Sequence, residues 1–110
     1  MLVEIYRVRR FNRNARGDLS VSSNGIRLRG AAFQHLRDSQ YIMVGVDGRK
    51  LILKKSDDPA NLKLRLAAQG KIGELGGKHL TQWLLERGFT KGQYQVQLEA
   101  DQVIVNQEPA

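Results

Sequence analysis

An arginine-rich segment near the start of the chain has the residue types best suited to binding a charged partner. The segment RVRRFNRNAR spans residues 7–16 and sets two asparagines among five arginines. Guanidinium groups bind phosphate oxygens through paired hydrogen bonds and stack on bases, and asparagine amides can reach base edges. We expect a nucleic-acid contact here, with the candidate residues Arg7, Arg9, Arg10, Asn12, Arg13 and Arg16. The alternative interpretation is a solvated strand end and loop.

Two further arginines belong to a short predicted strand downstream. Ile26 and Leu28 alternate with Arg27 and Arg29 directly after an Asn-Gly turn signal. Because successive side chains of a strand point to opposite faces, both arginines should leave on the face away from the two apolar residues. Arg27 and Arg29 therefore join the candidate nucleic-acid site. An exposed sheet face without a ligand is the alternative.

The charge of the chain is unevenly distributed. The net charge is +7, from 18 lysines and arginines against 11 acidic residues. Residues 1–37 hold eight arginines and only two acids, whereas residues 59–110 hold six bases and five acids. A one-sided basic excess is typical of proteins that bind polyanions. The sequence therefore predicts a nucleic-acid partner, DNA ahead of RNA, against the alternative of a basic surface that only aids solubility.

No catalytic or metal-binding set emerges. The chain has no cysteine, and its two histidines, His35 and His79, have no carboxylate partner at ligand spacing. The glycines of GKIGELGG do not match the phosphate-binding loop pattern. No apolar run approaches the roughly 18 residues that a membrane span needs. We therefore expect no cofactor, no metal, no membrane partner and a cytoplasmic location.

Hydrophobic periodicity predicts a single domain over residues 1–110 that is rich in short strands. The N-terminal part is predicted as a strand at 2–9 and a loop at 11–18, and SDDPAN at 56–61 as a linker. Between and after them we expect short strands at 19–21 and 26–28, a helix at 30–37, a hairpin at 41–55, a strand at 62–68, a helix at 78–88 and a hairpin at 94–105. Asp47-Gly48 is predicted to form the tight turn of the first hairpin, and Gly88 to end the second helix.

The order of these elements repeats. Residues 19–56 and 62–107 each run through short strand, second strand, helix and hairpin. One such unit is too small to bury a stable core, whereas two can cover each other's apolar faces. The predicted fold is α+β: a small strand-rich barrel built from two βαββ-like halves.

The residues that carry this pattern resemble known families. NGIRLRGAAFQHL followed by YIMVGVDGRKLILKK resembles the AbrB/MazE/SpoVT swapped-hairpin module, with Arg29 where that family usually has a proline. WLLERGF, with Trp83, Leu84, Gly88 and Phe89, resembles the related SymE toxin family, as do the turn glycine and valines that follow. The resemblance covers roughly residues 25–55 and 72–106.

The resemblance implies the swapped-hairpin fold and places Arg27 and Arg29 on or beside a DNA-binding surface. We expect a nucleic-acid-binding protein, such as a transcriptional regulator or an antitoxin-like module, with a homodimer left open. Two alternatives remain. One is a SymE-like toxin that cleaves RNA, and the other is a protein-interaction accessory module of a phage or mobile element.

Overall fold

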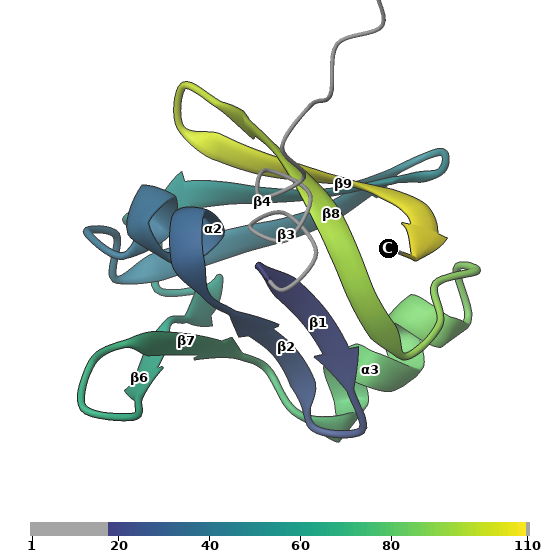
Figure 1. Cartoon of the computed structure of the whole chain (residues 1–110), viewed down its shortest axis with the longest axis horizontal. Helices are drawn as coiled ribbons and strands as arrows, with labels where there is room; N and C mark the ends of the chain where they lie inside the picture. Colours follow the sequence, from purple (N-terminus) through teal and green to yellow (C-terminus); the bar gives the residue numbers. More distant parts are fainter. Residues whose placement is uncertain (1–17, 110) are drawn as a thin grey trace, which may run out of the picture.

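Nine short strands and two helices make up residues 18–109, the part of the chain that the computed structural model describes (Figure 1). In chain order they are β1 (Leu19–Ser22), β2 (Gly25–Leu28), α2 (Gly30–Leu36), β3 (Tyr41–Asp47), β4 (Lys50–Ser56), β5 (Leu62–Lys63), β6 (Arg65–Ala67), β7 (Ile72–Leu75), α3 (Lys78–Leu85), β8 (Gly92–Glu99) and β9 (Gln102–Pro109). The predicted strand at 2–9, and the predicted loop at 11–18 except for Asp18, lie outside the described residues.

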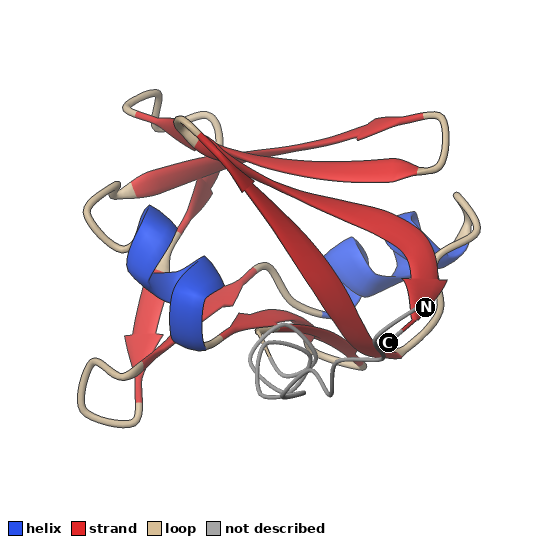
Figure 2. Ribbon diagram, turned by 45° about the horizontal axis from the view of Figure 1, so that its top comes forward, coloured by secondary structure: helices blue, strands red, loops and turns tan. Residues whose placement is uncertain are grey.

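The strands form one antiparallel sheet in the order β5-β3-β4-β9-β8-β1-β2-β7-β6. The two ends of this order, β5 and β6, are separated in the chain by Leu64 alone. Leu64 is buried, and its backbone N–H donates to the carbonyl of Gln40 at 2.9 Å. The sheet therefore curls into a nearly closed barrel that carries the two helices (Figure 2). The predicted α+β, strand-rich barrel is confirmed at this level.

The strand pairings of the first half of the chain recur in the second. β1 pairs with β2 as β6 pairs with β7, and the β3–β4 hairpin corresponds to the β8–β9 hairpin. Between the halves, β1 pairs with β8 and β5 pairs with β3. β2 pairs with β7, and β4 with β9. Each hairpin therefore lies between two strands of the other half.

The ends of the elements follow from local residue chemistry. β3 and β4 are joined by a two-residue turn of Gly48 and Arg49, with Gly48 at φ +62°, so the predicted tight turn forms, but one residue later than the predicted Asp47-Gly48 position, because Asp47 pairs with Lys50 as the last residue of β3. After α3, Gly88 has φ +94°, which favours glycine, and the Phe89 N–H donates to the Leu84 carbonyl at 3.1 Å. Phe89 is buried, as predicted. Gly88 ends α3 as the sequence predicted.

The predicted single strand at 62–68 is wrong in one respect. The chain changes partner at Leu64, pairing first with β3 and then with β7, so the segment forms two short strands instead of one. Leu66 lies opposite Gly73, which offers no side chain to pack against, and Leu66 is 61% exposed. The alternation was real, but its second part lies at the end of the strand order, where less of the core covers it.

The core fills the barrel. Tyr94, Phe33 and Phe89 are the largest fully buried side chains. The Tyr94 hydroxyl donates to the Thr90 carbonyl at 2.6 Å and accepts the Thr90 N–H at 2.9 Å, so burying this ring leaves no polar atom unpaired. Trp83 is only partly buried, with the Arg87 guanidinium 3.9 Å from its ring centroid.

Candidate nucleic-acid interface

A row of polar side chains crosses the outer face of five adjacent strands. Backbone register places these residues side by side from β6 through β7, β2 and β1 to β8, in the order Arg65, Glu74, Arg27, Ser20 and Gln93. Leu19 and Leu28, which flank this row on β1 and β2, are fully buried. Because successive side chains alternate between the faces of a strand, the row points away from the core.

Arg27 and Arg29 lie as the sequence predicted. Both are exposed, while Ile26 and Leu28 between and before them are buried. The structure adds Arg65, which register places two strands away from Arg27, on the other side of Glu74. We call Arg27, Arg29 and Arg65 the arginine face. It combines three guanidinium groups with small neighbours and a single acidic residue.

The three arginines differ in their contacts. The Arg27 Nη2 atom lies 3.0 Å from Glu74 Oε2, with side chains 46% and 31% exposed. An ion pair this exposed contributes about 0–1 kcal/mol to stability. Arg65 donates from Nη2 to the Gly76 carbonyl at 2.6 Å. Arg29 makes no ion pair with any residue in the described part of the chain, and its side chain is open to solvent.

A small polar hollow opens on the arginine face beside the β1–β2 turn. Its volume is about 140 Å³. It is lined by Ser22, Asn24, Ile26, Arg27, Arg65 and Glu74. These residues carry two guanidinium groups, one amide, one hydroxyl and one carboxylate. All of these groups except the carboxylate can donate hydrogen bonds to an oxyanion.

Asp18, the first of the described residues, links the start of β1 to the end of β2 and to α2. Its carbonyl accepts the Arg29 N–H at 2.8 Å, which ties β1 to the end of β2. Burial raises the pKa of the Asp18 carboxyl, and hydrogen bonds from the backbone N–H groups of Ala32 and Ala31 partly oppose this rise. These N–H groups belong to the first turn of α2, so Asp18 caps that helix from a neighbouring strand.

The same contact explains why no proline precedes α2. Arg29 has φ −138°, whereas proline is held near −65°. Proline would also lack the N–H that bonds to the Asp18 carbonyl. The residue that departs from the AbrB-type pattern is therefore required by the local geometry of this chain.

The other predicted site residues lie outside the described residues. They are Arg7, Arg9, Arg10, Asn12, Arg13 and Arg16.

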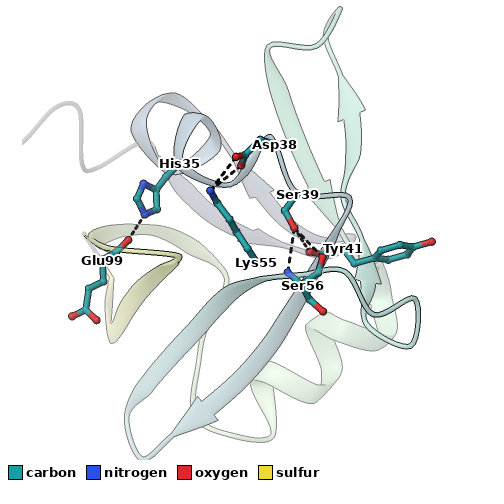
Figure 3. A network of polar contacts seen from close by, with 7 residues as sticks. All are labelled: His35, Asp38, Ser39, Tyr41, Lys55, Ser56 and Glu99. Carbon is teal, nitrogen blue, oxygen red and sulfur yellow. Dashed lines mark hydrogen bonds and ion pairs between the residues drawn. The ribbon is translucent and has the colours of Figure 1, made fainter.

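A second polar cluster lies at the end of α2, and the sequence did not single it out (Figure 3). Lys55 Nζ lies 2.9 Å from Asp38 Oδ1, and this hydrogen-bonded ion pair lowers the pKa of Asp38. The Ser39 hydroxyl accepts the Ser56 N–H at 3.1 Å and lies 2.7 Å from the Tyr41 carbonyl. These groups satisfy one another and tie the end of α2 to the β3–β4 hairpin, so we assign the cluster a structural role.

The histidines do not form a metal site in the described part of the chain. His35 Nε2 contacts the Glu99 carbonyl, and His79 is exposed on α3. Across residues 18–109, no three His, Asp or Glu side chains gather closely enough to hold a metal ion. His35 instead links α2 to the β8–β9 turn (Figure 3).

An apolar hollow of about 230 Å³ lies between α3 and the strands β3 and β5. It is lined by Val44, Ala60, Asn61, Leu62, Leu80 and Trp83. Trp83, which is partly buried, forms part of the wall of this hollow. It is the second surface of the barrel with a composition suited to a partner.

Comparison of the chain with protein-family models gives no match, and neither do comparisons with curated proteins and with solved structures. Neither helix in the described region is long and apolar enough to cross a membrane. The proposed function therefore depends on the residues of the barrel.

Proposed function

We propose that this protein binds nucleic acid, DNA in preference to RNA, by docking phosphate groups on the arginine face and on the arginine-rich segment at residues 7–16. The observation that carries this proposal is the registered row on the outer sheet face, where Arg27 and Arg65 flank Glu74, with Arg29 directly after β2 at the N-cap of α2. Arg27, Arg29 and Arg65 are all exposed. Arginine forks bind phosphate in a geometry that lysine cannot match.

We further propose that the barrel is of the swapped-hairpin type, with both halves supplied by one chain. The reciprocal pairing of β1 with β8 and of β5 with β3 supports this interpretation. A chain with both halves can carry an asymmetric binding face. Such a face suits docking dominated by phosphate contacts better than recognition of a symmetric palindrome. The contacts would release counterions, so affinity should fall steeply with salt.

The test is a salt titration of binding, followed by fluorescence anisotropy with duplex DNA, single-stranded DNA and RNA of one sequence. If four phosphates are neutralised, log K falls with log salt at a slope of about −3.6, or roughly 150-fold between 50 and 200 mM salt. The Arg27→Ala/Arg29→Ala variant should reduce that slope by about 1.8. The control is Arg49→Ala/Lys50→Ala, an equal charge change at the turn of the β3–β4 hairpin.

The contribution of the segment at 7–16 is tested separately. The Arg9→Ala/Arg10→Ala/Arg13→Ala variant should bind more weakly while its circular dichroism spectrum stays unchanged. No binding of any probe by the wild-type protein at 50 mM salt would refute the proposed function. Equal losses from the arginine-face variant and the hairpin-turn control would refute the location of the site. Cleaved RNA would instead favour the RNA-toxin alternative.

A further inference from the structure

The charge arrangement at the centre of the arginine face has a consequence beyond general binding. Glu74 is the only acidic residue in the registered row, and it lies between two arginines. Its carboxylate also lines the hollow that the Arg27 and Arg65 side chains border. A negatively charged group therefore stands where an incoming phosphate would find the most donors.

The ion pair is poorly suited to a purely structural role. Arg27 and Glu74 are both partly exposed, so their contact adds little to the stability of the fold. β2 and β7 are held together by backbone pairing on either side of this point, from Ile26 with Leu75 to Leu28 with Gly73. The carboxylate can therefore be displaced from Arg27 without loss of the strand pair.

The hollow has room for a tetrahedral oxyanion. Its volume of about 140 Å³ is close to that of the roughly 150 Å³ cavities that hold a benzene-sized molecule. Apart from the Glu74 carboxylate, its polar lining consists of the Asn24 side chain, the Ser22 hydroxyl and the two guanidinium groups. Each of these can donate a hydrogen bond to a phosphate oxygen. Glu74 alone would repel it.

We propose that the hollow between Arg27 and Arg65 is a binding site for a single phosphate group, and that the Glu74 carboxylate competes with phosphate for this site. This inference rests on the proposed function, since the phosphate belongs to a nucleic-acid backbone. In the free protein Glu74 holds Arg27, and a bound phosphate takes its place. The competitor weakens attraction to polyanions in general and so reduces binding to sequences that make no other contacts.

The test compares Glu74→Gln with Glu86→Gln. Both changes remove one negative charge and keep the shape of the side chain, but Glu86 lies at the C-cap of α3 beside Arg87, outside the registered row. At 50 mM salt, Glu74→Gln should tighten duplex DNA binding by about five- to tenfold, because repulsion at short range is removed and Arg27 is released. The salt slope should steepen by about 0.9. Glu86→Gln should change affinity by less than about twofold.

A second measurement tests the phosphate-binding site in the absence of nucleic acid. Inorganic phosphate is titrated into the wild-type protein and into Glu74→Gln while the Arg27 and Arg65 Nε–H signals and the Asn24 side-chain amide are followed by NMR. We expect these three signals to shift together, at lower phosphate concentration in the variant. Signals of Arg49, at the hairpin turn, serve as the internal control.

The outcomes separate the two proposals. Equal affinities of Glu74→Gln and Glu86→Gln, or weaker binding by Glu74→Gln, would show that Glu74 does not compete with phosphate. Either result would leave the proposed nucleic-acid binding intact. If the wild-type protein binds no nucleic acid but the three signals respond to phosphate, the phosphate-binding site is supported and the proposed function is refuted. Absence of any response to phosphate in both proteins would refute the proposed phosphate-binding site.

Discussion

Replacing Asp18 should change both the stability of the barrel and its dependence on pH. The carboxylate is 5% exposed and accepts hydrogen bonds from N–H groups in the first turn of α2. Asp18→Ala removes the cap and leaves these donors unpaired, a loss of about 2 kcal/mol. For a domain of this size that lowers Tm by roughly 10 °C. Thermal unfolding followed by circular dichroism measures the loss.

The pH dependence follows from the direction of the pKa shift. Burial raises the pKa of Asp18 above 3.8, so the folded protein holds this proton more tightly than the unfolded chain does. The resulting stabilisation is fully present below pH 3.8 and is lost as the pH rises through the folded pKa. Asn at this position keeps one acceptor oxygen and cannot ionise.

The measurement is the difference in unfolding free energy between wild type and Asp18→Asn from pH 3 to 7, obtained by urea denaturation. Other carboxyl groups, including Asp38 with its lowered pKa, contribute equally to both proteins and cancel. We expect the wild type to gain stability relative to the variant as the pH falls toward 3.8. A difference that is constant with pH, or that moves the other way, would refute the reasoning that burial dominates at this carboxyl.

Four further outcomes are expected. Thr81→Val should cost about 1–3 kcal/mol, because the Thr81 hydroxyl accepts the Gly25 N–H at 2.8 Å and donates to the Ser22 carbonyl at 2.6 Å; Thr81→Ser should retain most of that stability in the same urea titration. Leu64→Ala should cost about 2–5 kcal/mol, because Leu64 is buried where the two ends of the sheet meet, and full retention of stability would contradict its role in closing the barrel. The arginine-face variant should bind DNA with a shallower salt slope than the hairpin-turn control. Glu74→Gln should bind more tightly than Glu86→Gln.

Local patterns in the sequence were enough to predict most elements. The tight turn at Gly48, the helix that contains Phe33 and the Gly88 stop all depend on residues close together in the chain. Such signals report backbone preference directly, so they survive folding. The alternation of Arg27 and Arg29 with buried residues succeeded for the same reason.

The composition of the site depended on contacts that no local pattern reveals. Arg27 and Glu74 are 47 positions apart and meet only because β2 pairs with β7 in one register. Alternation around Leu64 could have placed Arg65 on an outer face, but not beside Glu74. The cap from Asp18 to α2 likewise joins a residue to a helix that begins twelve positions later. Pairing register is set by the packing of the whole barrel.

The pair at the centre of the arginine face also bears on why one chain would carry both halves. β2 and β7 are corresponding strands of the proposed halves, and they pair with Arg27 opposite Glu74. Two identical halves would place an arginine opposite an arginine, or a glutamate opposite a glutamate, and like charges directly opposite destabilise a sheet. An arginine against a glutamate removes that repulsion and makes the face asymmetric. Two unlike halves in one chain therefore permit a binding surface in which the Glu74 carboxylate pairs with the central Arg27 guanidinium. A symmetric pair of chains could not form this arrangement.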